Sequence, residues 1–180
     1  MNTLQRLREL GQSPWYDNVQ RGLIKSGELK RLFDNGLLGV TSNPTIFQKA
    51  VESCADYDEQ ITQLHSQGKD ALQIYDELTI EDVRNAADLL RGIYASSDRD
   101  DGLVSIEVPP MYAHDPEKTI TSARALFKKI DRENILIKIP GTAQSGAAIR
   151  KLISEGINVN VTLLFSAAHY ETQALSLIHI

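Results

Sequence analysis

Short apolar runs alternate along the chain with longer segments in which apolar positions recur at helical spacing. The short runs favour buried strands, which we place at residues 14–19, 37–41, 103–108, 135–139 and 157–162. The amphipathic segments predict helices at residues 3–10, 28–34, 57–67, 70–78, 79–95, from 115 or 116 to 130, and at 142–155, with two more that begin near residues 44 and 166. This alternation predicts an α/β fold with a parallel sheet, either open or closed into a barrel.

The strand at residues 135–139 contains a single charged side chain. Strand alternation places its three isoleucines on one face and Lys138, together with Leu136, on the other. An ammonium group beside an apolar run is costly to desolvate, so Lys138 must reach water, find a partner or lose its proton more readily than a surface lysine. Because only the neutral amine attacks a carbonyl, Lys138 is a candidate Schiff-base lysine. The alternative is a lysine whose aliphatic stem extends from the strand end to solvent.

Local signals mark several helix ends. Asn43 followed by Pro44 favours an N-cap and a first helical position. Thr142 follows the strand-ending pair Pro140-Gly141 and is expected to cap the next helix. The stretch Thr79-Ile80-Glu81-Asp82 resembles an acidic capping box, which predicts that one helix ends and another begins there.

Polar residues follow or close each predicted strand, where the carboxyl ends of parallel strands meet on one side. In α/β barrels this side carries the active site, so we expect these side chains to converge on one mouth. The candidates are Asp17, Asn43, Glu107, Lys138, Asn160 and Thr162.

Each of these polar residues also has a structural explanation. Asp17 can cap a turn, and Asn43 is adequate as an N-cap. Glu107 can merely neutralise the lysine of the neighbouring strand, and Asn160 and Thr162 can tie down the loop that follows them. Taken together, their shared position at strand ends favours a functional site.

Composition and charge describe an ordinary globular protein. Of its 180 residues, 42% are hydrophobic and 24% charged, and the net charge of −5 argues against nucleic acid or an anionic membrane as a partner. The single Cys54 excludes an internal disulfide and fits a reducing compartment. The amino terminus lacks the apolar core of a signal peptide, and no apolar run approaches a membrane span, so we expect a cytoplasmic protein.

Two other kinds of site are poorly supported. The stretch Gly141–Gly146 lacks the Gly-Lys-Ser/Thr ending of a P-loop and the glycine spacing of a dinucleotide fingerprint. Metal binding is not expected, since no two of the four histidines have the i,i+4 spacing of a zinc helix; they are His65, His114, His169 and His179.

Four stretches of the chain carry a resemblance to a known family: Gly39–Phe47, Ser105–Val108, Ile135–Thr142 and Gly156–Ser166. In sequence, order and spacing they resemble the transaldolase family. The segment Ser13-Pro14-Trp15-Tyr16-Asp17-Asn18 resembles its longer bacterial branch, which includes fusions to glucose-6-phosphate isomerase. The resemblance runs from about residue 3 to about residue 174.

The resemblance implies a (β/α)8 TIM barrel, of which this chain covers about the first five strands. Residues 1–174 would form a partial barrel, and residues 175–180 an unmatched tail. The implied activity belongs to the pentose phosphate pathway: a dihydroxyacetone unit passes from sedoheptulose 7-phosphate to glyceraldehyde 3-phosphate. The substrates are sugar phosphates, and no metal or organic cofactor is implied because Lys138 would itself form the imine and act as the electron sink.

The resemblance also implies a role for each remaining candidate. Asp17 would take the proton from the hydroxyl whose oxygen becomes the leaving aldehyde. Glu107, through a water held with Thr162, would move protons while the carbinolamine dehydrates. Asn43 and Asn160 would hold the hydroxyls of the dihydroxyacetone unit.

A family barrel needs three more strand–helix units, which normally supply the groups that bind the substrate phosphate. We therefore expect residues 1–180 alone to be inactive, and poorly soluble or self-associating through the open sheet edges. Two alternatives remain open. A fructose-6-phosphate aldolase would use the same lysine without an acceptor sugar, and a non-enzymatic barrel fragment would not form an imine at all.

Overall fold

A computed structural model describes residues 2–175 and 177–178, so half of the tail expected at residues 175–180 lies outside the described residues. Its strands form one five-stranded sheet in the order β1-β2-β3-β4-β5, with β2 parallel to β1 and β5 parallel to β4. The strands are β1 Trp15–Tyr16, β2 Gly39–Thr41, β3 Leu103–Glu107, β4 Ile135–Pro140 and β5 Val159–Thr162. The predicted α/β class with a parallel sheet is confirmed.

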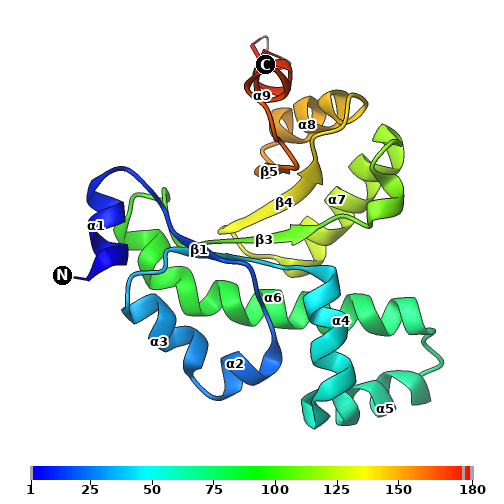
Figure 1. The fold of residues 1–180 in the computed structure, drawn as a ribbon. Coiled ribbons are helices and arrows are strands. Elements are labelled where there is room, and N and C mark those ends of the chain that lie inside the picture. Colours follow the sequence, from blue (N-terminus) through cyan, green and yellow to red (C-terminus); the bar gives the residue numbers. More distant parts are fainter. Residues whose placement is uncertain (1, 176, 179–180) are drawn as a thin grey trace. The chain divides into compact units, whose positions relative to one another are not determined.

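Along the chain, helices alternate with the strands, with a helix before β1 and another after β5 (Figure 1). They are α1 Thr3–Glu9, α2 Arg21–Lys25, α3 Glu28–Asp34, α4 Pro44–Ser53, α5 Asp58–Ser66, α6 Ala71–Ser96, α7 Pro116–Ile130, α8 Ser145–Ser154 and α9 Ala167–Leu175, with short 3-10 turns η1 Ala55–Tyr57 and η2 Pro110–Tyr112. Among the described residues, none of these helices is long and apolar enough to cross a membrane.

The chain divides into two compact units. Unit 1 comprises Met1–Val104 and Arg132–Asn134, and unit 2 comprises Ser105–Asp131 and Ile135–Ile180. The boundary falls within β3, after its second residue. The single partial barrel expected over residues 1–174 stays a prediction.

Unit 1 is built around the long helix α6, whose apolar side packs against its neighbours. Leu78, Val83 and Leu90 of this helix are almost completely buried. Phe47 and Tyr57 join the same core from α4 and η1. Burial of such a stripe stabilises a helix far more than its intrinsic propensity does.

The prediction that separate helices occupy residues 70–78 and 79–95 is wrong, because α6 runs through both without a break. Its capping box lies at Asp70 and Gln73, and Thr79 sits in the helix interior with its hydroxyl donating to the Tyr75 carbonyl at 2.8 Å. The apolar side chains on both sides of Thr79 face one core, so ending the helix there would expose buried surface.

Helix α2 was not expected from the sequence. It has five residues, and its N-cap Gln20 makes no side-chain capping hydrogen bond, so neither length nor a capping residue marks it. A helix this short is not stable in isolation, so it depends on tertiary contacts.

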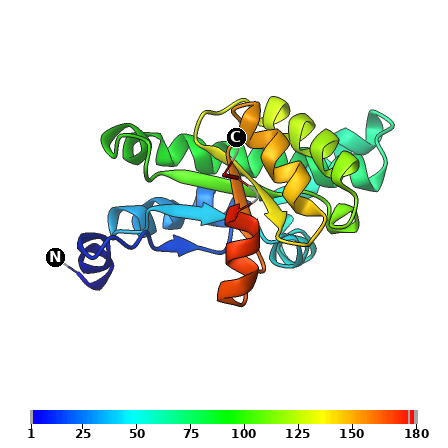
Figure 2. The same cartoon turned by 90° about the horizontal axis from the view of Figure 1, so that it is seen from above.

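Unit 2 confirms the alternation predicted for β4. Ile135, Ile137 and Ile139 are buried, while Lys138 and Leu136 on the opposite face are partly exposed. Helices α7 and α8 lie side by side (Figure 2). Arg124 of α7 donates from Nε to Glu155 at 2.8 Å, and hydrogen bonding to Arg124, together with Lys151, lowers the pKa of Glu155 to about 2.

The expected N-cap at Thr142 is wrong. Helix α8 begins three residues later, after Gln144, and has no side-chain cap. The Thr142 hydroxyl instead donates to the Ala113 carbonyl at 2.6 Å, which ties the β4–α8 loop to the segment before α7. The next helix expected in this region does carry a cap, because Ser166 Oγ accepts from the His169 backbone N–H.

Replacing Gly102 should destabilise unit 1 strongly. Gly102 has a φ of +75°, and a Cβ there would lie 2.7 Å from Tyr94 Cα. We expect Gly102→Ala to lower the free energy of unfolding by about 2–4 kcal/mol. Gly92→Ala, in the exposed part of α6 with nothing near the added Cβ, should raise it by about 0.5–1 kcal/mol. Denaturant unfolding of the two variants checks the contrast, which equal effects would contradict.

Asn43 caps α4, as predicted, because its Oδ1 accepts from the Thr45 and Ile46 backbone N–H groups at 3.1 and 3.3 Å. Asn43→Ala should therefore lower the free energy of unfolding by about 1 kcal/mol, whereas Asn43→Ser, which retains a capping oxygen, should stay within about 0.3 kcal/mol. Urea titration compares them. Equal losses would mean that the cap contributes little and that the amide matters for another reason.

Candidate functional site

Unit 2 contains an ion pair between two predicted site residues. Lys138 Nζ on β4 lies 3.6 Å from Glu107 Oε2 at the end of β3, and the two side chains are only 14% and 18% exposed. Each residue stands on the less buried face of its strand. The carboxylate therefore compensates part of the cost of desolvating the ammonium group.

The strand register brings Asn160 to the same face as this ion pair. Asn160 of β5 is the register partner of Lys138 in β4, and paired residues of adjacent strands project to the same side. Asn160 Nδ2 donates to Ser105 Oγ at 3.2 Å. Ser105 lies two residues before Glu107 in β3 and so shares its face.

Ser105 is a site residue that the sequence interpretation missed. It is completely buried, and its hydroxyl holds the carboxamide of Asn160. The available signal was its position: a polar residue at an alternate position from Glu107 in an otherwise apolar strand.

Thr162 ends β5 on the same face, two residues after Asn160. Its Oγ1 is buried and makes no hydrogen bond to any residue that the structure describes. A buried hydroxyl is normally satisfied, so this atom marks a place for a water or a ligand oxygen. The next residue, Leu163, has a φ of +62°, which turns the chain sharply away from the strand.

Unit 1 contains a second pair of predicted site residues. Asn43 Nδ2 donates to Asp17 Oδ2 at 3.2 Å, while the amide oxygen of Asn43 caps α4. Asp17 directly follows β1, and Asn43 lies two residues beyond β2. Since β1 and β2 are parallel, both side chains come from the carboxyl ends of their strands.

The structure thus joins Asp17 to Asn43 within unit 1, and Lys138 to Glu107 within unit 2. Asn160 shares the face of the second pair, as expected. Among residues 2–175 and 177–178, no three His, Cys, Asp or Glu side chains come together in a way that could hold a metal ion.

The side chains of Lys138, Glu107 and Thr162 determine which reactions this group of residues in unit 2 can carry out. An amine on a rigid strand can add to a carbonyl once it has lost its proton. A carboxylate at 3.6 Å can move protons directly or through one water. The buried Thr162 hydroxyl is able to hold that water.

Comparison with known proteins identifies the family to which the chain belongs. Residues 14–177 match the family model described as "Transaldolase/Fructose-6-phosphate aldolase". The chain is 50% identical over 171 residues to "Transaldolase 2" of Nostoc sp. (strain PCC 7120), an alignment that covers 94% of this chain and 45% of that protein. It is 49% identical to "Transaldolase 2" of Nostoc punctiforme over 174 residues, or 96% of this chain and 46% of that protein. It is also 46% identical to "Transaldolase" of Trichodesmium erythraeum over 170 residues, or 94% and 45% of the two chains.

The chain spans about half the length of the curated relatives it matches. The match nevertheless extends through all five strands and through every predicted site residue. The family fold is a (β/α)8 barrel, which agrees with the parallel strands and intervening helices described above. The chain therefore belongs to the transaldolase/fructose-6-phosphate aldolase family.

Proposed function

We propose that the protein which contains this chain is a transaldolase of the pentose phosphate pathway. It transfers a dihydroxyacetone unit from sedoheptulose 7-phosphate to glyceraldehyde 3-phosphate through an imine on Lys138. The observation that carries the proposal is the Lys138–Glu107 ion pair on a face that also holds the unpartnered Thr162 hydroxyl. Family membership supports it, and the names of the relatives support a transaldolase-type function.

The first half of the reaction uses the unit 2 group. Glu107 takes a proton from the Lys138 ammonium group, and the resulting neutral amine adds to the ketose carbonyl to give a carbinolamine. Glu107 then delivers a proton to the carbinolamine oxygen through a water held by Thr162, and that oxygen leaves as water as the imine forms. The distance of 3.6 Å between Lys138 Nζ and Glu107 Oε2 leaves the carboxylate near the reacting nitrogen.

The second half requires a base that acts on the substrate rather than on the lysine. Asp17 accepts the proton of the hydroxyl next to the breaking carbon–carbon bond, the aldehyde departs, and the electron pair of that bond is held as an enamine on Lys138. Asn43 and Asn160 bind hydroxyls of the retained dihydroxyacetone unit. Family membership is the reason for assigning both groups to one reaction.

A fructose-6-phosphate aldolase is the second candidate function, because the matching family description names both activities. It would use the same imine but release the three-carbon unit without an acceptor sugar. Dependence of product formation on an added aldose phosphate separates the two activities. The cytoplasmic location and the inactivity of residues 1–180 alone stay predictions.

Lys138 should be the site of a reducible imine. Since the relatives are about twice as long, the assay uses a completed chain in which the part of the Nostoc sp. protein beyond the alignment follows residues 1–174. Incubation with fructose 6-phosphate and borohydride should attach a three-carbon unit to Lys138. Lys138→Arg should abolish labelling, because arginine offers no neutral amine near pH 7.

Peptide mass spectrometry locates the adduct. Labelling that persists in Lys138→Arg would move the imine elsewhere and end the assignment. Residues 1–180 alone serve as a parallel sample, for which we expect no turnover because the phosphate-binding part of the family barrel is absent.

Glu107→Gln should separate proton transfer from simple charge pairing. If Glu107 moves protons, turnover in the completed chain should fall about 100-fold while the reduced adduct still forms at Lys138. Glu155→Gln is the matched control, since Glu155 is also ion-paired in unit 2 but lies at the end of α8. A near-normal turnover rate in a less stable Glu107→Gln protein would show that Glu107 only pairs with Lys138 and does not transfer protons.

A further inference from the structure

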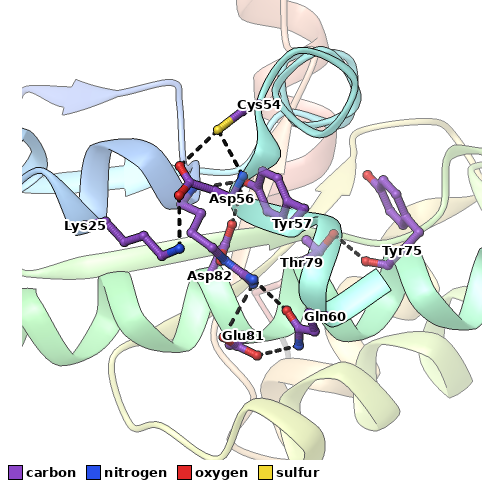
Figure 3. A network of polar contacts seen from close by, with 10 residues as sticks. Lys25, Cys54, Asp56, Tyr57, Gln60, Tyr75, Thr79, Glu81 and Asp82 are labelled. Carbon is purple, nitrogen blue, oxygen red and sulfur yellow. Dashed lines mark hydrogen bonds and ion pairs between the residues drawn. The ribbon is translucent and has the colours of Figure 1, made fainter. Parts of the chain in front are cut away.

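A buried polar network in unit 1 has no part in the chemistry described so far. Its centre is Asp82 of α6, which is completely buried. Arg21 Nε donates to Asp82 Oδ1 at 2.9 Å, and the Tyr57 hydroxyl donates to Asp82 Oδ2 at 2.8 Å. Figure 3 shows Tyr57 and Asp82 within this network. Gln60 accepts from Arg21 Nη1 at 2.6 Å, and Glu81 pairs with Arg21 Nη2 at 3.4 Å.

Burial dominates the electrostatics of this network. Desolvation raises the pKa of Asp82, although Arg21 and Tyr57 act in the opposite direction. Desolvation also raises the pKa of Tyr57, so its hydroxyl keeps its proton and remains a donor to Asp82. A charged group this deeply buried is costly unless it is fully paired, so the network defines one arrangement of its members.

The network fixes the start of α2, the helix that was not predicted from the sequence. The first backbone N–H of α2, at Arg21, donates to the Tyr57 hydroxyl at 2.9 Å. Tyr57 therefore supplies the cap that Gln20 does not. The Arg21 guanidinium also lies over the Tyr57 ring, 4.7 Å from its centroid. Asp17 is separated from this anchored point by only three residues.

The same tyrosine also packs against the first turn of α4. Phe47 and Tyr57 stack edge to face with ring centroids 5.6 Å apart, and Phe47 is 2% exposed. The Phe47 N–H donates to the Asn43 carbonyl at 2.9 Å, so Asn43 sits one turn from this contact. Tyr57 is thus in contact with both segments that carry the Asp17–Asn43 hydrogen bond.

We infer that Arg21, Tyr57 and Asp82 are positioning residues, which hold Asp17 and Asn43 in the geometry that carbon–carbon cleavage requires. The inference rests on the proposed function of Asp17. The network makes no contact with the reacting atoms in this account. Its effect passes through the two segments that it anchors, one by a backbone hydrogen bond and the other by ring packing.

Tyr57→Phe tests the inference because it removes the hydroxyl and keeps the ring. In the completed chain we expect turnover to fall about 10-fold, while the total borohydride labelling of Lys138, as the imine of the intact ketose or of its three-carbon unit, is unchanged. In an Asp17→Asn, Asn43→Ala background, Tyr57→Phe should change the remaining turnover by less than about 2-fold, since a positioning residue has no effect once both of its targets are replaced.

Thr79→Val is the matched control. It also removes a buried hydroxyl, but this one lies within α6 and donates to the Tyr75 carbonyl of the same helix. It should change turnover by less than about 2-fold in both backgrounds. An equal effect of Tyr57→Phe in both backgrounds, or an equal loss of turnover and trapping, would overturn the inference and leave the network a purely structural one.

Amide hydrogen exchange supplies a readout that does not depend on activity. In Tyr57→Phe, the Arg21 N–H has lost its acceptor and should exchange at least about 10-fold faster than in Thr79→Val. An unchanged exchange rate at Arg21 would overturn the inference, even where trapping at Lys138 fails. Failure of trapping together with fast exchange would reject the proposed function but retain the anchoring of α2.

Discussion

The pleat of the strands in unit 2 is the constraint on which the candidate site depends. Lys138 is paired in register with Asn160, and Glu107 alternates with Ser105 along β3, so all four polar side chains leave the sheet on one face. The opposite face of β4 is filled by buried isoleucines. A slip of one residue between β4 and β5 would turn Asn160 away from Lys138 and expose apolar side chains, so packing and chemistry select the same register.

The structural and functional explanations of the polar residues are not exclusive. Asn43 both caps α4 with its amide oxygen and donates to Asp17 with its amide nitrogen. Glu107 forms an ion pair with Lys138, and in the proposed function the same carboxylate also moves protons during imine formation. In Asn43 the two roles rest on different atoms, whereas in Glu107 both fall to one carboxylate, so single substitutions must be chosen to separate stability from chemistry.

The sequence predicted correctly those elements that are determined by residues close together in the chain. The alternation in β4 and the cap at Asn43 are of this kind, and both were predicted. The continuity of α6 was not, because a capping-box pattern at Thr79 was outweighed by burial on both sides of it. Helix α2 and its Tyr57 cap were missed for a similar reason: the partner lies 36 residues away and no short motif announces it.

The central claim is that the reaction proceeds through an imine on Lys138, and that residues at the ends of other strands transfer its protons and bind its hydroxyls. The most direct measurement is a crystal structure of the completed chain after borohydride reduction with fructose 6-phosphate. The account predicts a three-carbon unit bonded to Lys138 Nζ, with its hydroxyls on the side-chain amides of Asn43 and Asn160. An adduct on another residue, or one whose hydroxyls contact neither asparagine, would contradict it.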